Sequence, residues 1–205
     1  MHIKRQVLLS YAYKLQSIAI FINAARLPKQ IHQRTSNMSH LSHQNQPHCH
    51  TANFALLTIS DTRNQSTDKS GQLIKTMLEK ASQTLVAYQI VKDEPQQIKH
   101  TIDHWHQSIK PDIIITTGGT GLASRDNTVP IIKQFIKQEI VGFGEIFRML
   151  SYQQIGPAAI LSRALAGKRD HAYIFALPGS TNAVKLALEK IIIPQISHLI
   201  YEKNR

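Results

Sequence analysis

The chain has 205 residues, 42% of them hydrophobic, which is enough for one folded domain with an apolar core. Its formal net charge is +11, but six Lys and Arg residues precede Asp61, the first acidic residue, so over half of the excess lies near the N-terminus. The charge is therefore weak evidence for nucleic-acid binding, and basic and aromatic residues do not alternate as they do in nucleic-acid platforms. The single cysteine, Cys49, excludes an intrachain disulfide framework and is typical of a reducing compartment.

Residues 1–53 differ in composition from the rest of the chain. Apolar residues spaced for one face of a helix, with a basic polar face, are Leu8, Tyr11, Leu15, Ile18 and Ile22. Lys14 interrupts this apolar run, so neither a membrane span nor a secretory signal is predicted. Three interpretations stay open: an organellar transit peptide, a non-native upstream extension, or a helix that docks at an oligomer interface. We expect that residues 1–37 are absent from the working protein and that Met38 is its native start.

Residues 36–50 are rich in Ser, His, Gln and Asn, a composition typical of a flexible linker. Four histidines and Cys49 in this stretch could bind a metal, but no paired-cysteine spacing indicates a structural zinc site. We therefore expect residues 1–53 to be a disordered or non-native extension, and residues 54–205 to form the folded domain.

Within that domain, apolar stretches that favour buried strands alternate with stretches whose apolar residues recur at helical spacing. The predicted strands are residues 54–60, 85–91, 112–117 and 173–177. The predicted helices follow residues 68–71, start at 93–95, span 128–138 and 143–154, and start near 182, with Pro194 expected to kink or restart the last one. Trp105 lies on the apolar face of the second helix and is interpreted as a core anchor.

This alternation predicts an α/β fold in which helices cover both faces of a parallel sheet. Ligands of such folds bind beyond the carboxyl ends of the strands. Four predicted loops with polar or glycine-rich sequences fall at that edge, and they contain Ser60 and Asp61; Asp93; Gly118 to Asp126; and Pro178, Gly179 and Ser180.

The loop that follows the third strand carries Gly118, Gly119 and Gly121 around Thr120. Glycine lets backbone N–H groups approach a ligand closely, and Thr128 and Pro130 are typical of an N-cap and a first helical turn. A strand, a glycine loop and a helix start in this order favour anion binding, and nearby Asp126 suggests a metal-bridged phosphate. The alternative is a tight turn with Asp126 as a helix cap.

Two further acidic positions have structural alternatives of the same kind. Asp93 precedes Glu94 and Pro95, so it is either a functional carboxylate or the N-cap of the next helix. Ser60 and Asp61 are either ligand contacts or part of an Asx-type turn.

In combination, several motifs of residues 54–205 resemble the family of molybdenum cofactor biosynthesis protein B and the molybdopterin adenylyltransferases. The matching segments are Ile59-Ser60-Asp61, Asp68-Lys69-Ser70-Gly71, Thr117-Gly118-Gly119-Thr120-Gly121 with Arg125-Asp126, Gly142-Phe143-Gly144-Glu145, Phe147-Arg148-Met149-Leu150-Ser151, Ile160-Leu161-Ser162-Arg163 and Leu177-Pro178-Gly179-Ser180. Residues 142–167 are similar to the B-protein branch in particular.

The resemblance implies a three-layer α/β/α fold of the molybdopterin-binding-domain type, with a mostly parallel sheet, assembled as a homotrimer or homohexamer. It implies binding of molybdopterin and, in active members, transfer of AMP from ATP to the pterin phosphate with Mg²⁺. The family's two catalytic aspartates match Asp93 and Asp126, which would also hold the metal. The binding positions would be Ser60, Asp61, Gly118, Gly119, Thr120, Gly121, Pro178, Gly179 and Ser180.

Three hypotheses for the function follow. The first is a cytoplasmic, magnesium-dependent molybdopterin adenylyltransferase with no membrane or nucleic-acid partner, possible partners being other cofactor-biosynthesis proteins. The second is a pterin-binding or scaffold protein of the same pathway without turnover. The third, a nucleic-acid-associated protein, is suggested by the pI of about 9.9 alone. The residues agree with the chemistry of the first, because joining two anions needs positioning and charge neutralisation, for which one or two carboxylates around Mg²⁺ suffice. The sequence does not separate the first hypothesis from the second.

Overall fold

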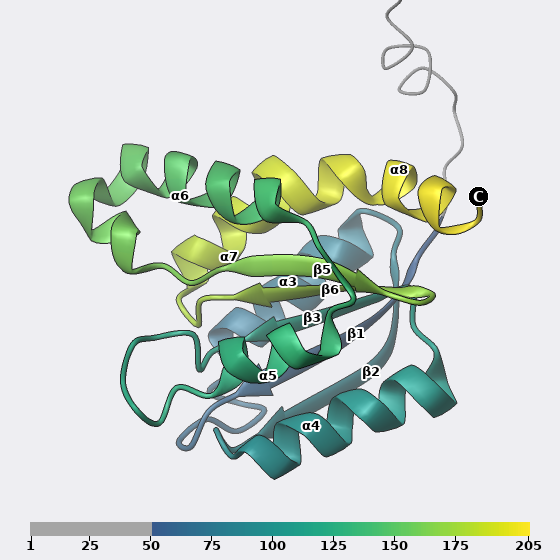
Figure 1. Ribbon diagram of the computed structural model, residues 1–205, viewed down its shortest axis with the longest axis horizontal. Coiled ribbons are helices and arrows are strands. Elements are labelled where there is room, and N and C mark those ends of the chain that lie inside the picture. The colour runs from purple at the N-terminus through teal and green to yellow at the C-terminus, as the bar shows by residue number, and fades with distance from the viewer. Residues whose placement is uncertain (1–50) are drawn as a thin grey trace, which may run out of the picture. The chain divides into compact units, whose positions relative to one another are not determined.

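The computed structural model describes residues 51–205, so the predictions for residues 1–50 lie outside the described part of the chain (Figure 1). The elements are β1 (Asn53–Ile59), α3 (Lys69–Lys80), β2 (Thr84–Val91), α4 (Pro95–His104), the π-helical segment η1 (Trp105–Ile109), β3 (Ile113–Thr117), α5 (Thr128–Phe135), β4 (Gln138–Glu139), α6 (Val141–Ile155), the 3₁₀ segment η2 (Gly156–Leu161), β5 (Leu165–Arg169), β6 (Ala172–Leu177), α7 (Thr181–Ala187), the π-helical segment η3 (Leu188–Ile192) and α8 (Ile193–Lys203).

The strands form one sheet in the order β2-β1-β3-β6-β5-β4. The first four of these are parallel, which confirms the predicted mostly parallel α/β sheet. β5 runs antiparallel to β6, and β4 runs antiparallel to β5. Neither of these two antiparallel strands was predicted, and the helix expected over residues 128–138 ends at Phe135, because residues 138–139 pair with β5 instead.

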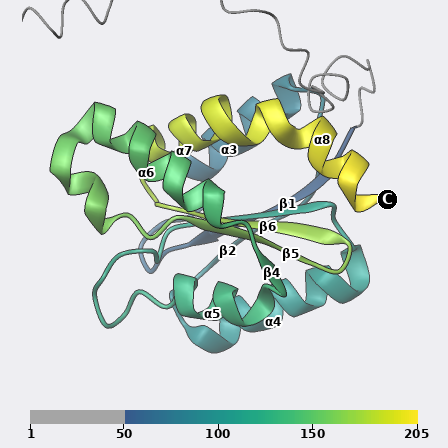
Figure 2. The same ribbon diagram turned by 45° about the horizontal axis from the view of Figure 1, so that its top comes forward.

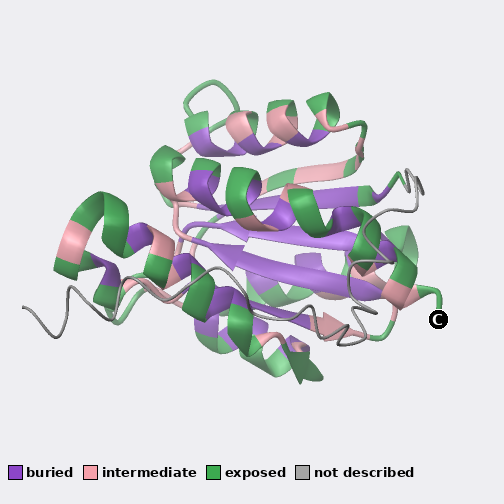
Figure 3. Cartoon of the chain, turned by 90° about the horizontal axis from the view of Figure 1, so that it is seen from above, coloured by how far each residue is buried: buried purple, intermediate pink, exposed green. Residues whose placement is uncertain are grey.

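Helices cover both faces of the sheet, as Figure 2 shows, with α3, α6, α7 and α8 on one face and α4 and α5 on the other. Alternate residues of β1 point to the two faces: Phe54 and Leu56 join the core under α3, α6, α7 and α8, whereas Ala55, Leu57 and Ile59 join the core under α4 and α5. Trp105 is buried in the second core, as predicted. The central strands β1, β3 and β6 are buried between helices whose outer surfaces are exposed (Figure 3). No helix of residues 51–205 is long and apolar enough to cross a membrane.

Local interactions fix where the helices start. Asp68 caps α3 by accepting a hydrogen bond from the Gly71 N–H, and Ser180 caps α7 by accepting one from the Ala183 N–H. The predicted N-cap role of Thr128 is wrong: it is the first residue of α5, and its hydroxyl donates to the Gly118 carbonyl at 2.9 Å. Pro194 lies in the first turn of α8, where a missing N–H is tolerated, so it starts that helix.

His106 of η1 stacks on His171, which lies in the tight turn between β5 and β6. The rings of His106 and His171 lie parallel, with centroids 4.4 Å apart. Asp170, which has a positive φ of 51°, pairs with His106 and Lys137. Within residues 51–205, His106 Nδ1 and His171 Nε2 are buried without a hydrogen-bond partner. Burial lowers the pKa of His171, the charges of His106, Lys203 and Lys110 lower it further, and Asp170 opposes them. The surroundings of His171 therefore favour its neutral form.

We predict that this turn makes the protein sensitive to mild acid. Because the folded-state pKa of His171 lies below its ordinary value of about 6.5, the unfolded chain binds the proton first. The stabilising contribution of neutral His171 is therefore complete above pH 6.5 and is lost as the pH falls from there through the folded-state pKa. Thermal unfolding between pH 8 and 5 should show a smaller loss of stability for His171→Gln than for the wild type. His100→Gln, at an exposed position on α4, is the control; a wild-type slope in His171→Gln would contradict the prediction.

Candidate functional site

The four predicted loops converge at the carboxyl edge of the sheet. Thr58 of β1, Thr117 of β3 and Leu177 of β6 lie in register, and Ile59 pairs with Val91 of β2. The residues that follow these strands therefore leave the sheet side by side. The structure thus brings together the loops that carry all of the site residues predicted from the sequence.

The glycine loop packs directly on its neighbours. Gly118 has φ of 101°, and a Cβ placed there would lie 2.2 Å from the Ile59 carbonyl oxygen. Gly119 has φ of 60°, and its Cβ would lie 2.2 Å from Thr128 Oγ1 and 2.4 Å from Asp93 Oδ2. Only glycine fits at either position, because both the backbone conformation and the space exclude a side chain. Within residues 51–205, the backbone N–H groups of Gly119, Thr120 and Gly121 donate to no protein acceptor. Three adjacent N–H groups are thus free for a ligand.

Asp93 does not cap α4, which rules out the structural alternative. Glu94 occupies the N-cap position, and Asp93 turns toward the glycine loop instead. There Oδ1 accepts the Asn127 N–H at 3.1 Å, and the Asn127 amide donates to the Asp93 carbonyl at 3.1 Å. The start of α5 thus holds Asp93 against the glycine loop.

Asp126 and Asp61 lie near Asp93. Asp126 Oδ2 accepts the Ala123 N–H at 2.8 Å, inside the loop, and a Cβ at Gly121 would lie 2.6 Å from the same oxygen. Asp61 Oδ1 accepts the Asp93 N–H at 3.2 Å. Burial raises the pKa of Asp93, and the negative charges of Asp126 and Asp61 raise it further, against the bond from Asn127. Such mutual repulsion favours a cation at this point.

The remaining predicted residues have structural contacts of their own. Ser60 Oγ accepts hydrogen bonds from the N–H groups of Thr62 and Arg63. Ser60 therefore has the turn role that the sequence analysis gave as one alternative for Ser60 and Asp61. The side chain that makes the turn is that of Ser60 and not that of Asp61. Ser180 caps α7. Pro178 accepts a hydrogen bond from the Thr117 hydroxyl at 3.2 Å, and a Cβ at Gly179 would lie 3.3 Å from Gly118 Cα. These residues shape the loops around the glycines.

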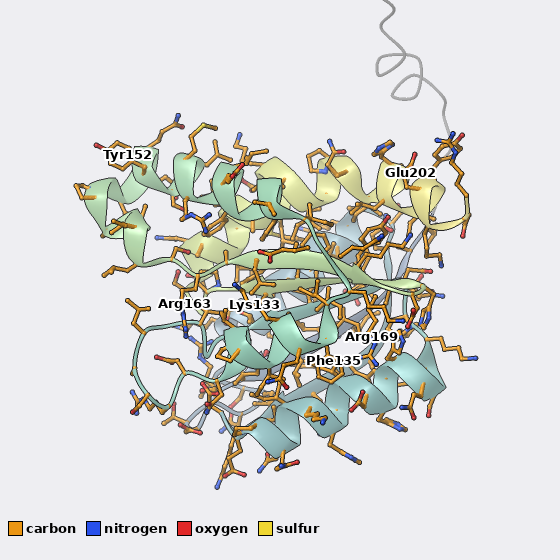
Figure 4. All side chains as sticks on the ribbon, viewed as in Figure 1. Lys133, Phe135, Tyr152, Arg163, Arg169 and Glu202 are labelled. Atoms are coloured by element: carbon orange, nitrogen blue, oxygen red, sulfur yellow. The ribbon has the colours of Figure 1, made fainter. Side chains whose placement is uncertain are left out.

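Arg163 contacts the glycine loop, which the sequence did not indicate. The sequence placed this residue only in the matching motif Ile160-Leu161-Ser162-Arg163. Figure 4 shows it reaching from the segment after η2 toward the glycine loop. Its Nε donates to the Thr120 carbonyl at 2.9 Å, and its Nη2 donates to the carbonyls of Gly121 and Asp126. Arg163 therefore holds the glycine loop in place by hydrogen bonds from its guanidinium group to backbone carbonyl oxygens.

Arg63 and Asp68 form a second cluster that was missed as a functional one. Asp68 is fully buried, and its two oxygens accept from Thr58, Ser70, Tyr88 and the Gly71 N–H. Burial alone would raise the pKa of Asp68, but these hydrogen bonds together lower it, and burial beside Asp68 raises the pKa of Tyr88. The only sequence signal for this cluster was the Asp68-Lys69-Ser70-Gly71 motif. The other two hydrogen-bond donors to Asp68, Thr58 and Tyr88, lie on β1 and β2.

The acidic residues fit a divalent cation that shares its coordination with a substrate. Within residues 51–205, no group of three or more His, Cys, Asp or Glu side chains could hold a metal by itself. Asp93 lies against Gly119 and Asp126 lies against Gly121, so both carboxylates border the glycine loop. Mg²⁺ is commonly bound through one or two carboxylates plus substrate phosphates and water. The N–H groups of Gly119, Thr120 and Gly121, which have no protein acceptor within residues 51–205, belong to the same loop.

Comparison with known proteins gives a consistent set of relatives. Residues 55–198 match the family model described as "Probable molybdopterin binding domain". The chain is 51% identical to molybdenum cofactor biosynthesis protein B of Halalkalibacterium halodurans over 153 residues, covering 74% of this chain and 90% of the relative. It is 49% identical to the protein of the same name from Staphylococcus aureus over 167 residues, covering 80% of this chain and 98% of the relative.

Solved structures agree. A crystal structure of molybdenum cofactor biosynthesis protein B aligns with a TM-score of 0.74 at 41% identity, covering 76% of this chain and 98% of that one. The tungsten cofactor synthesizing protein of Pyrococcus furiosus aligns with a TM-score of 0.68 at 37% identity, with the same coverage. These similarities confirm the three-layer fold expected from the sequence.

We predict that Gly119→Ala disrupts the site and the fold together. The added Cβ would displace Thr128 and Asp93, and alanine is strained at this φ. The melting temperature should drop, by an amount typical of about 1–3 kcal/mol of backbone strain, and ligand affinity should fall with it. Gly142→Ala is the matched control, because a Cβ there meets nothing within 4 Å and helix α6 favours alanine. A Gly119→Ala protein as stable as Gly142→Ala would show that the loop is not tightly packed.

Proposed function

The chain belongs to the molybdopterin-binding domain family of molybdenum cofactor biosynthesis, and from this premise we propose that it transfers AMP from ATP to the phosphate of molybdopterin in a magnesium-dependent reaction. The observation that carries the proposal is the placement of Asp93 against Gly119 and of Asp126 against Gly121, in a glycine loop with three N–H groups that have no protein acceptor within residues 51–205. That arrangement offers metal ligands and anion donors at one point.

In the proposed reaction, an anionic oxygen of the pterin phosphate attacks the α-phosphorus of ATP. A P–O bond forms between them, the bond to the β-phosphate oxygen breaks, and pyrophosphate leaves with that electron pair. The nucleophile is already ionised, so the chain needs no strong general base. Catalysis then depends on holding two anions together in line, which positioning and charge neutralisation achieve.

The residues divide this work among them. The N–H groups of Gly119, Thr120 and Gly121 would hold phosphate oxygens, and Arg163 and Thr128 keep the loop that bears them in shape. Asp93 and Asp126 would hold Mg²⁺, which when bound would neutralise phosphate charge. Asn127 fixes the orientation of the Asp93 carboxylate. Ser60, Asp61, Pro178, Gly179 and Ser180 would border the bound pterin and nucleotide.

We predict that Asp93→Asn and Asp126→Asn each lower turnover by roughly two orders of magnitude or more, because each removes a charge that the transition state uses but keeps the side chain's shape. Pyrophosphate release would be measured with purified protein, molybdopterin, ATP and Mg²⁺, beside the melting temperature. Asp103→Asn on α4 is the control for loss of one negative charge. Undiminished release in both site variants would reject this mechanism, and a wild type that binds molybdopterin without release would favour the non-catalytic alternative.

We also propose that the chain assembles as a homotrimer or homohexamer through α6 and η2. Large apolar side chains are exposed along these two elements, and Figure 4 shows Tyr152 on the outer side of α6. They are Val141, Ile146, Met149, Tyr152, Ile155, Ile160 and Leu161. So many large exposed apolar side chains on two consecutive elements are typical of a protein–protein interface.

This assembly should be sensitive to charge on α6. Met149→Lys, alone and with Ile146→Lys, should shift the mass measured by light scattering toward the monomer, because burying an unpaired lysine is costly. Gln154→Lys, at an exposed polar position of the same helix, should leave the mass unchanged. A monomeric wild type, or an intact oligomer in the double variant, would place the interface elsewhere or remove it.

A further inference from the structure

Arg63 ties together three segments at the carboxyl edge. Its Nη1 donates to Ser70 Oγ in the first turn of α3 at 2.6 Å, and its Nη2 donates to the Gly179 carbonyl at 3.1 Å. Its backbone N–H donates to Ser60 Oγ at 3.2 Å. The guanidinium is thereby fixed between the loop after β1 and the loop after β6, with about a third of the side chain exposed.

The buried acid beside Arg63 does not consume its hydrogen bonds. Arg63 Nη1 lies 3.6 Å from Asp68 Oδ1, which is too long for a hydrogen bond, and the Asp68 oxygens are already satisfied by four neutral donors. Ser70 accepts from Arg63 and donates to Asp68, so it orients the guanidinium. Two of the five guanidinium N–H groups make these hydrogen bonds, and the other three have no hydrogen-bond acceptor within residues 51–205, so a ligand that reaches this partly exposed side chain could accept from them.

Arg163, another guanidinium at this edge, is engaged differently. Its Nε and Nη2 donate to the backbone carbonyls of Thr120, Gly121 and Asp126. It braces the glycine loop, whereas Arg63 lies on the inner side, where a Cβ at Gly179 would be 3.3 Å from Gly118 Cα and 3.9 Å from Arg63 Nη1. Arg63 is thus the cation adjacent to the start of the glycine loop.

The edge of the sheet therefore has two electrostatic halves. Asp93, Asp126 and Asp61 gather on the side of α4 and α5, because Asp93 precedes α4 and bonds to Asn127 at the start of α5. Arg63 lies on the side of α3 and α7, through Ser70 and Gly179. Gly118 stands between the halves. A phosphate that arrives with a metal suits the acidic half, and a phosphate that arrives without one suits Arg63.

We propose that Arg63 binds the phosphate monoester of the pterin, while the acidic half receives the metal-bearing nucleotide. This inference rests on the proposed function for the identity of the two ligands. A bidentate guanidinium matches two oxygens of a phosphate dianion and neutralises it beside the second anion. Arg63 is therefore a specificity residue: it selects the phosphorylated pterin and positions its nucleophilic oxygen.

The test is a comparison of two ligands with four proteins, in the absence of ATP and Mg²⁺. Equilibrium binding of molybdopterin and of its phosphatase-treated, dephosphorylated form would be measured for the wild type, Arg63→Met, Arg63→Lys and Lys69→Met. Lys69 is exposed and adjacent to Asp68, so its variant removes the same charge nearby. Melting temperatures of all four proteins would be recorded.

We expect Arg63→Met to weaken molybdopterin binding about 10- to 100-fold, the effect of losing charged hydrogen bonds, and to change binding of the dephosphorylated form less than about threefold. Arg63→Lys should fall between, because lysine keeps the charge and loses the fork. Lys69→Met should bind both forms like the wild type.

Three results would overturn the inference. Equal losses for both ligands would mean that Arg63 only shapes the loops. If Lys69→Met weakens molybdopterin binding as much as Arg63→Met does, the effect comes from the overall positive charge and not from a direct contact of Arg63. If Arg63→Met binds molybdopterin like the wild type, the phosphate lies elsewhere. If Arg63→Met does not fold, the same ligand comparison in Arg63→Lys decides. The binding test contains no ATP, so its outcome is independent of the separate pyrophosphate-release assay. A wild type that binds with this dependence on Arg63 in the first assay, but releases no pyrophosphate from ATP in the second, would refute the adenylyl transfer and keep the inference.

Discussion

Close backbone contact at Gly118 is the constraint on which the site depends. A side chain there would strike the Ile59 carbonyl, and Gly179 approaches Gly118 from the other side. The loops after β1, β3 and β6 are therefore packed backbone to backbone, which follows from the parallel register that ends the three strands at one level. Thr128 and Arg163 hold the far part of the same loop through its carbonyls. The loop's remaining N–H groups stay free for a ligand because its carbonyls and its turn are fixed by other elements.

Charged groups surround this contact. On one side, burial and the negative charges of Asp126 and Asp61 raise the pKa of Asp93. On the other side, Arg63 lies 3.6 Å from the buried Asp68, whose oxygens accept hydrogen bonds from neutral donors. This arrangement of charge lies at the carboxyl edge of the sheet. It prepares the edge of the sheet for ligands that bring their own charge, as a metal-bound nucleotide and a pterin phosphate do.

The strands of the parallel sheet and the loop positions could be predicted, because long β-branched runs such as residues 113–117 and glycine-rich turns carry strong local signals. The two antiparallel strands β4 and β5 could not: residues 138–139 are too short, and Leu-Ala-Gly-Lys-Arg at 165–169 lacks β-branched residues and is a strand through its pairing with β6. Thr128 is a residue type that often caps helices, but its hydroxyl donates to the Gly118 carbonyl instead. Arg63 and Arg163 gain their parts from partners 116 and 42 residues away, a distance over which no local pattern reports. The resemblance supplied Asp93 and Asp126, and the structure shows that Asp93 is held against the glycine loop by Asn127, whereas Asp126 is held inside that loop by the Ala123 N–H.

The central claim is that a divalent cation joins Asp93 and Asp126 to phosphate at the glycine loop. A crystal structure of the protein grown with molybdopterin, a non-hydrolysable ATP analogue and Mn²⁺ in place of Mg²⁺ tests it most directly, because Mn²⁺ is located by anomalous scattering. The account predicts one strong Mn²⁺ peak bound by both carboxylates and by phosphate oxygens that accept from the N–H groups of residues 119–121. Bound ligands with Mn²⁺ away from these carboxylates, or with no phosphate at the loop, would contradict it.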